Sequence, residues 1–218
     1  MGLIYSGKLW MIQRFISGFS NNSYLVTCKE TNQSIIIDTP KNPYELIDAA
    51  IKYDVRGIFI THGHYDHIEG LVDVYNNFKV PIGIGQNDAN TLPIKPIKKL
   101  KIDNLSIYRF GNIVIRSIKT PGHTPGSRCY LLPSESPGSE PHLFSGDTLF
   151  PGGPGKSSSY NKLLEIVDSI KHLYTLPNHT VVLPGHGEFI TIKDSKKESD
   201  EFLKKPINPK MYGEITWN

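Results

Sequence analysis

Short apolar runs separated by turns are the feature of this sequence that most constrains its fold. Runs rich in Ile, Val and Leu recur along the chain, and a few amphipathic segments interrupt them. We predict strands at residues 23–28, 34–38, 58–60, 80–84, 105–110, 112–119, 128–132, 142–145 and 180–183. We predict helices at residues 43–51, 68–78, 163–174 and 192–203. Because strands outnumber helices, the chain cannot close as a helical bundle.

Two groups of strands need helical cover on their outer faces, so we expect the α/β class and a four-layer αββα sandwich. No internal repeat is visible, and the segment of most biased composition, residues 133–141, is short enough to be a hairpin loop. We therefore expect residues 1–218 to form a single domain, with residues 204–218 as a C-terminal tail.

The composition argues against several classes of protein. The chain has 218 residues, with 24 Lys and Arg against 21 Asp and Glu. Its longest uninterrupted apolar runs have four residues, far below the roughly 20 that span a bilayer, so we expect no membrane partner. Two Cys in separate predicted strands and the lack of a leader pattern favour a cytoplasmic location. The basic residues form short clusters typical of solvated surface, so no nucleic-acid partner is expected.

The strongest chemical signal directly follows the predicted strand at residues 58–60. His62, His64, Asp66 and His67 fall within six consecutive positions. Alternate residues of an extended segment project the same way, so His62 and His64 can bind one metal ion. Asp66 and His67 then point elsewhere. The alternative is a His-rich surface loop that binds no ion.

Three further ligand-type residues, His123, Asp147 and His186, each follow a predicted strand and lie beside Gly or Pro. Each alone is a weak signal, because such residues are more often turn or capping residues. Together with the His-rich loop, they put five imidazoles and two carboxylates at the ends of four strands. A structural zinc ion needs only four ligands, so seven favour two divalent ions bridged by a carboxylate and a hydroxide. We expect zinc at one edge of the sheets, with iron or manganese as alternatives.

These motifs, in this order between about residues 15 and 190, resemble those of the metallo-β-lactamase-fold hydrolases. The resemblance implies the αββα fold and a set of ligands for each of two ions. It implies that the first ion is bound by His62, His64 and His123, and the second by Asp66, His67 and His186.

The resemblance also gives roles to two aspartates. Asp147 would bridge the pair of ions. Asp38, which ends the predicted strand at residues 34–38, would lie under the site and support a ligand, and a carboxylate that orients an imidazole is physically sensible. The alternative for Asp38 is that it caps the helix that follows.

Within this family the chain is most similar to the glyoxalase II group, the hydroxyacylglutathione hydrolases. Residues 146–150 are followed by a Gly-rich stretch that ends in Lys156. The resemblance implies that Lys156 helps to bind the substrate, and a plain surface lysine is the alternative. Two Tyr positions of that group hold Ser158 and Glu188 here, and the 32 residues after His186 are too few for its helical C-terminal domain. We therefore expect a glyoxalase II-like centre without that domain.

The chemistry of two bridged ions predicts metal-assisted hydrolysis of a small-molecule acyl substrate. A bridging hydroxide is available at neutral pH and can attack an acyl carbonyl. Asp66 and Asp147 are the expected catalytic carboxylates, and Asp66 can position the nucleophile and take its proton. A thiol with a pKa near ~8.5 leaves as thiolate, whereas an amide nitrogen needs a proton donor. A thioester or activated ester is therefore the expected substrate.

Other activities stay open. A persulfide dioxygenase of this fold uses a single iron, which His62, His123 and Asp147 would hold here. The same dimetal centre also suits a lactonase or a phosphodiesterase. The aromatic tail, residues 211–217, can reach the pocket or a partner subunit of a homo-oligomer.

Overall fold

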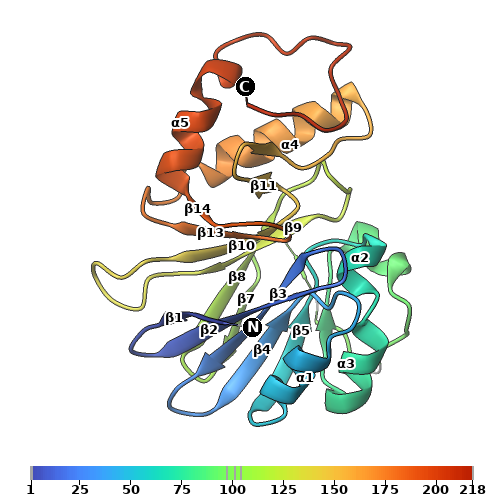
Figure 1. The fold of residues 1–218 in the computed structure, drawn as a ribbon, viewed down its shortest axis with the longest axis vertical. Helices are drawn as coiled ribbons and strands as arrows, with labels where there is room; N and C mark the ends of the chain where they lie inside the picture. Colours follow the sequence, from blue (N-terminus) through green and yellow to red (C-terminus); the bar gives the residue numbers. More distant parts are fainter. Residues whose placement is uncertain (1, 97, 101, 104, 218) are drawn as a thin grey trace.

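Among the residues that the computed structural model describes, 2–96, 98–100, 102–103 and 105–217, two six-stranded β-sheets stack face to face (Figure 1). The first sheet contains, in spatial order, β1 (Gly2–Ser6), β2 (Trp10–Ser17), β3 (Asn21–Cys28), β4 (Gln33–Ile37), β5 (Asp54–Phe59) and β6 (Ile82–Gly83). The second contains β14 (Ile190–Thr191), β13 (Val181–Pro184), β10 (His142–Gly146), β9 (Arg128–Leu132), β8 (Ile113–Lys119) and β7 (Ile107–Phe110). Residues 1 and 218, the ends of the predicted domain, lie outside the described residues.

Helices cover the outer faces of both sheets (Figure 1). The first sheet carries α1 (Tyr44–Ala50) and α3 (Leu71–Phe78), and the second carries α4 (Tyr160–Leu173) and α5 (Ile192–Leu203). In α4, Leu163, Ile166, Val167 and Ile170 recur at helical spacing and are all buried, so one face of this helix packs on the sheet. The prediction of an αββα sandwich is confirmed. In the described part of the chain, no helix combines the length and the apolar character needed to cross a bilayer.

Aromatic side chains fill the space between the two sheets. The ring of Phe59 in β5 lies 5.2 Å from that of Tyr130 in β9 and 5.4 Å from that of Tyr108 in β7. Tyr24 in β3 and Phe144 in β10 make a second such pair, with ring centroids 5.1 Å apart. Tilted and edge-on aromatic pairs of this kind stabilise a core beyond the area that they bury.

The directions of the strands bring several loops to one edge of the sandwich. β5 runs parallel to β4, and β13 runs parallel to β10. Because β8 and β10 are both antiparallel to β9, they run the same way as each other. The Arg128 amide donates to the Thr61 carbonyl, and the Asn22 amide donates to the Gly185 carbonyl. These two bonds join the sheets at the edge where β5, β8, β10 and β13 end.

Two N-terminal strands, β1 and β2, are missing from the prediction. In β2, Trp10 and Ile12 are buried between the sheets, whereas Phe15 is buried on the opposite face, in the core beneath α1 and α3. A strand that buries side chains on both faces does not show the simple alternation that identifies a half-buried strand.

The predicted helix at residues 68–78 is wrong in extent, because the structure divides it. Helix α2 (Tyr65–Ile68) begins earlier and takes Asp66 and His67 out of the predicted loop. The chain then turns at Gly70, where a Cβ atom would lie 2.3 Å from the Pro40 carbonyl oxygen. A larger residue does not fit there, so Gly70 lets this turn pack tightly on the loop after β4.

The C-terminal tail folds back over the second sheet. Trp217 is buried, its ring lies 5.1 Å from that of Phe202 in α5, and its amide donates to the Gly152 carbonyl. Ser157 and Gly213 exchange two backbone hydrogen bonds. The tail is thereby fixed beside the segment that follows Asp147.

His142, at the start of β10, generates a prediction about pH. Burial lowers the pKa of His142 from 6.5 to about 4, and the side chain is 3% exposed. The unfolded chain therefore binds more protons than the folded chain between these values, and the free energy of unfolding falls as the pH falls. Because of His142, the free energy of unfolding of the wild-type protein should fall by about 2 kcal/mol between pH 7 and pH 5. We expect His142→Phe to abolish this part of the fall, as measured by urea unfolding at both pH values. An equal pH slope in both proteins contradicts this.

Candidate metal centre

The structure brings all seven candidate ligands together at the edge where the four strands end. Within the described residues, three overlapping groups have ligand atoms that lie within 4.8 Å of one another. One group is His62, His64 and His123; the second is Asp66, His67 and His186; the third is His62, His67 and Asp147. The side chains therefore form one continuous cluster.

The first group is a triangle of imidazoles from two loops. His62 Nε2 lies 3.1 Å from His64 Nδ1, and the ring of His123 is 4.8 Å from that of His62 and 4.5 Å from that of His64. Two ligands of a tetrahedral ion at about 2.0–2.1 Å lie roughly 3.3 Å apart. The spacing of the nitrogens in this group fits a single ion of that kind.

The second group combines the two residues on α2 with His186. His186 Nε2 lies 3.3 Å from His67 Nε2 and 3.2 Å from Asp66 Oδ2. Asp66 Oδ2 lies 3.8 Å from His67 Nε2. Helix α2 is short, but it turns Asp66 and His67 toward the same point, which an extended loop would not do.

Asp147 lies between the two groups. Its Oδ1 is 3.3 Å from His67 Nε2, and its Oδ2 is 3.5 Å from His123 Nε2 and 3.7 Å from His186 Nε2. One carboxylate thus faces imidazoles of both groups, as a bridging ligand must. Asp147 follows Gly146, whose φ is +49° and where a Cβ atom would lie 2.5 Å from Thr61 Oγ1, so Gly146 lets the chain turn there.

Hydrogen bonds on the far side of three imidazoles fix their orientation. His67 Nδ1 lies 3.0 Å from Asp38 Oδ2, and His123 Nδ1 lies 2.8 Å from the Lys156 carbonyl oxygen. His62 Nδ1 lies 3.1 Å from Thr61 Oγ1, whose own hydrogen is donated to Asp38. An acceptor at Nδ1 keeps the proton there and leaves Nε2 as a free lone pair directed into the cluster.

Asp38 supports two of these contacts. It is 2% exposed, its Oδ1 accepts the Thr61 amide hydrogen at 2.8 Å, and its Oδ2 accepts from the Thr61 hydroxyl at 2.7 Å. Its backbone adopts φ +55°, which directs the carboxylate under the His-rich loop. The alternative role as a helix cap is wrong, because α1 begins after Pro43 without a side-chain cap from any described residue.

The charges in the cluster are strongly coupled. The hydrogen bond from His186 lowers the pKa of Asp66. Burial would raise the pKa of Asp147, but the charges of neighbouring imidazoles, led by His67, lower it. Burial would likewise lower the pKa of His67, but the carboxylates of Asp147 and Asp38 raise it well above its usual value. Both cluster carboxylates are therefore ionised and call for positive charge between them.

Three further imidazoles of the cluster have a shifted pKa, which is lowered in two of them and raised in the third. Burial, followed by repulsion from His67, lowers the pKa of His62, and burial also lowers the pKa of His123. The pKa of His186 is raised, and the largest cause is its own hydrogen bond to Asp66. Neutral imidazoles are the form that binds a metal ion.

Two orphaned atoms test whether metal ions fit here. His123 Nε2 and Asp147 Oδ1 are buried, and neither has a hydrogen-bond partner among the described residues. Buried polar atoms are costly unless satisfied, and both point into the cluster. Five imidazoles and two carboxylates are also the donor types that zinc prefers. The residues present therefore fit divalent ions.

Sequence reasoning missed the pair Asn21 and Asn22 at the start of β3. Both side chains are fully buried. Asn21 Nδ2 donates to Asp66 Oδ2 at 2.9 Å, and Asn22 Nδ2 donates to the carbonyls of Pro184 and Gly187. These bonds tie the first sheet to the loop that carries His186. A pair of asparagines carries no local signal, because its role appears only across the two sheets.

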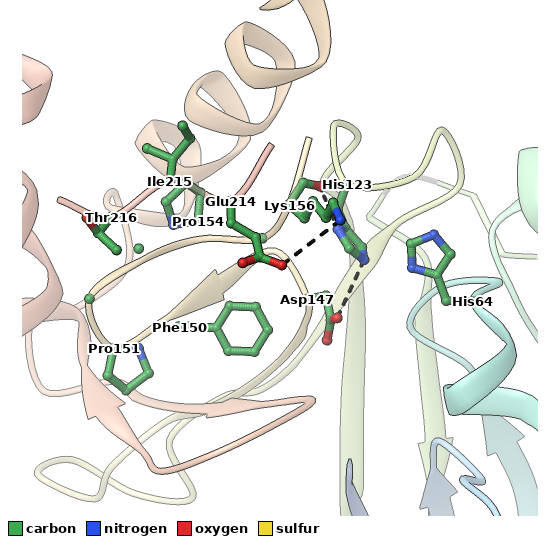
Figure 2. Close-up of a pocket in the computed structure, with 13 residues that line it drawn as sticks. His64, His123, Asp147, Phe150, Pro151, Pro154, Lys156, Glu214, Ile215 and Thr216 are labelled. Atoms are coloured by element: carbon green, nitrogen blue, oxygen red, sulfur yellow. Dashed lines mark hydrogen bonds and ion pairs between the residues drawn. The ribbon is translucent and has the colours of Figure 1, made fainter. Parts of the chain in front are cut away.

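A cavity of about 500 Å³ opens directly beside the cluster. Figure 2 shows His64, His123 and Asp147 along one side of it, with Phe150 and Pro151 on the other. The hairpin of β11 (Leu149–Phe150) and β12 (Gly153–Pro154) and tail residues 214–216 form much of its wall.

Lys156 lines the same cavity, but the structure gives it a neighbour that the sequence did not suggest. Lys156 Nζ lies 4.0 Å from Glu214 Oε1, and both side chains are largely exposed (Figure 2). An exposed pair at this distance is weak, so both groups are free to turn toward a substrate. The tail therefore supplies an acidic group to the pocket wall.

Comparison with known proteins gives consistent matches. The family model of the metallo-beta-lactamase superfamily matches residues 16–186. The chain is 29% identical to a probable polyketide biosynthesis zinc-dependent hydrolase of Bacillus velezensis, over 83% of this chain and 79% of the relative. It is 32% identical to a probable hydroxyacylglutathione hydrolase of Schizosaccharomyces pombe, over 82% of this chain and 67% of the relative.

A solved structure gives the same result. A metallo-beta-lactamase from Staphylococcus aureus superposes with a TM-score of 0.77 at 27% identity, over 88% of this chain and 62% of the other. The chain thus spans about two thirds of the length of the S. pombe relative and of this structure. The fold, the ordered motifs and these matches agree, and the chain belongs to the metallo-beta-lactamase superfamily.

Proposed function

We propose that this chain is a two-metal hydrolase that cleaves a thioester or activated ester of a small acyl substrate. The observation that supports it most is the position of Asp147, whose carboxylate faces imidazoles of both ligand groups at 3.3–3.7 Å. A centre for a single structural ion would close with four ligands, whereas this cluster offers seven.

The proposed ligand sets follow the geometry. His62, His64 and His123 would hold one ion, and Asp66, His67 and His186 would hold the other, while Asp147, which faces both groups, would serve both. When bound, such ions lower the pKa of water toward about 7 and polarise the carbonyl that is attacked. Asp38 and the Lys156 carbonyl keep the proton of His67 and His123 on Nδ1, so that Nε2 stays available.

Asp66 is the proposed group for positioning water and accepting its proton. Its side chain is 29% exposed, against 12% for Asp147, so solvent reaches Asp66 more readily. The Asn21 amide holds Asp66 Oδ2 at 2.9 Å, which fixes the direction of the carboxylate. A carboxylate held in this way loses little freedom when it takes part in proton transfer.

The lining of the pocket favours a substrate whose thiol portion is narrow and mainly uncharged. Its wall consists largely of Phe150, Pro151 and the backbone of residues 152–155, so apolar and amide groups fit against it. The charges of Lys156 and Glu214 offset each other. A thiol is also the leaving group that departs most readily without a proton donor, since its pKa is near ~8.5.

The relatives support this choice of chemistry. One is named as a hydroxyacylglutathione hydrolase, an enzyme of a glutathione thioester, and another as a zinc-dependent hydrolase of polyketide biosynthesis. The element that the two names share is hydrolysis. We therefore propose the same class of reaction here, with zinc as the metal and the identity of the thiol set by the pocket.

A substrate panel tests the reaction. We expect the zinc-loaded protein to release free thiol from small acyl thioesters at least about tenfold faster, in kcat/KM, than it opens lactones or cleaves phosphodiesters, because a thiolate leaves without a proton. Thiol release is followed with a chromogenic disulfide, oxygen with an electrode, and metal content by elemental analysis. Oxygen uptake with one iron per chain contradicts the proposal and favours a persulfide dioxygenase, whereas preferential phosphodiester cleavage favours a phosphodiesterase.

Removal of the metal generates a prediction about stability. The candidate ligands come from four separate segments of the chain, so ions that bind only the folded state stabilise it by about 4 kcal/mol each at a thousandfold excess over Kd. We expect chelation to lower the Tm by roughly 10 °C or more in a calorimeter. Zinc, added back, should restore it. A Tm that does not change on chelation and reloading is the opposite result.

The exposed pair in the pocket generates a prediction about specificity. Glu214→Gln leaves the charge of Lys156 uncompensated, so kcat/KM should rise about two- to fivefold for thioesters with a carboxylate on the thiol arm, relative to uncharged ones. Lys156→Gln should shift the ratio the other way. Glu201→Gln, on the exposed side of α5, is the matched control. Equal ratios in all four proteins would show that the pair does not face the substrate.

A further inference from the structure

A buried carboxylate that is not among the candidate ligands lies beside the first ligand group. Asp88 belongs to the 3₁₀ helix η1 (Gln86–Thr91), which follows β6, and its side chain is 4% exposed. Its Oδ2 accepts hydrogen bonds from the Gly63 amide at 2.9 Å and the Thr124 hydroxyl at 2.6 Å. Its Oδ1 accepts from the Gly126 amide at 2.8 Å.

These donors belong to the two loops that carry the first ligand group. Gly63 is the residue between His62 and His64, and Thr124 directly follows His123. One carboxylate therefore bonds to residues that are next to all three imidazoles in the sequence. The two loops are about 60 residues apart in the sequence, and η1 reaches both from a third position.

The packing around Asp88 leaves little room for the loops to move independently. A Cβ atom at Gly126 would lie 2.4 Å from Asp88 Cγ, and one at Gly63 would lie 2.3 Å from Thr91 Oγ1. Within η1, the Thr91 hydroxyl donates to the Asp88 carbonyl at 2.8 Å. The loops are thus held against η1 by direct backbone contact as well as by hydrogen bonds.

We propose that Asp88 is a positioning residue that sets the distance between His123 and the pair His62 and His64, and thereby the metal affinity of the first ligand group. This inference rests on the two-ion centre proposed above. The second group depends instead on Asn21 and Asp38, which contact Asp66 and His67. Asp88 should therefore act on one half of the centre only.

A carboxylate is needed at this position because both of its oxygens accept. An asparagine of the same shape has one accepting oxygen, and its amide nitrogen is a donor. If the asparagine oxygen faces Gly126, the backbone amide of Gly63 loses its acceptor. If the asparagine side chain is flipped, the backbone amide of Gly126 loses its acceptor instead. In either orientation one backbone amide of a ligand loop loses its acceptor on η1, and outer contacts of this kind typically change metal affinity by about 10–100-fold.

The test measures zinc affinity separately for each half of the centre. Apo-protein is titrated with Zn²⁺ against a competing chelator in two backgrounds. His186→Ala weakens the second group and leaves the first, whereas His64→Ala weakens the first and leaves the second. We expect Asp88→Asn to raise the Kd about 10–100-fold in the His186→Ala background and less than twofold in the His64→Ala background. Asp73→Asn, an exposed acid on α3, is the charge-matched control.

Other outcomes overturn the proposal. An unchanged Kd in both backgrounds, even with a lower Tm, would show that Asp88 serves folding alone. Equal weakening in both backgrounds would show a general loss of structure. If Asp88→Asn does not fold, Thr124→Val removes one of the three bonds and should raise the Kd several-fold in the His186→Ala background only.

The two proposals can fail separately. A wild-type chain that binds a single ion overturns the two-ion function, but the His186→Ala background still decides the role of Asp88. A wild-type chain that binds two ions, together with an Asp88→Asn variant of unchanged affinity, overturns the inference about Asp88 and leaves the proposed function intact.

Discussion

The constraint on which this structure depends is that several polar loops must meet at one edge of two stacked sheets, where many of their polar groups are buried. Buried polar groups are costly unless they are hydrogen-bonded. The chain meets this requirement with bonds that cross between the sheets. The Tyr24 hydroxyl of the first sheet donates to the Pro184 carbonyl of the second, and the Tyr130 hydroxyl of the second donates to the Ile60 carbonyl of the first. The aromatic rings of the core thus carry hydroxyls that fix the strand ends.

Two buried carboxylates support the cluster from beneath and from the side. Asp38 contacts Thr61 and His67, whereas Asp88 accepts from the Gly63 amide, between His62 and His64, and from the Thr124 hydroxyl, next to His123. Each accepts from at least two residues that are far from it in the sequence. Because bonds to a charged acceptor are stronger than neutral ones, two such residues can hold several loops in place. The geometry of the imidazoles is therefore prepared by the protein before any ion binds.

The residues that would carry out the reaction and those that would select the substrate lie on different elements of the fold. The candidate ligands follow rigid strands or lie on α2, while the pocket wall comes from the β11–β12 hairpin and the tail. Loops on a rigid scaffold can vary without disturbing the reactive groups. This chain is similar over most of its length to relatives whose printed names differ, which agrees with such a division.

The sequence identified the layered fold and the seven clustered side chains because both leave local patterns. A short apolar run followed by His or Asp beside Gly can be recognised from a few adjacent residues. Four such runs predict four strands that each end in a candidate ligand. It did not identify β1 and β2, whose burial on both faces hides the alternation, and it placed Asp66 and His67 in a loop instead of on α2.

The sequence by itself determined which side chains could bind metal ions, since residue type and spacing decide that chemistry. Only the tertiary structure decided which nitrogen of His62, His67 and His123 faces the cluster, that Asn21 and Asp88 support it, and that Glu214 lies beside Lys156. These features are contacts between residues that are distant along the chain. They depend on how the two sheets pack, and no local pattern of residues records that packing.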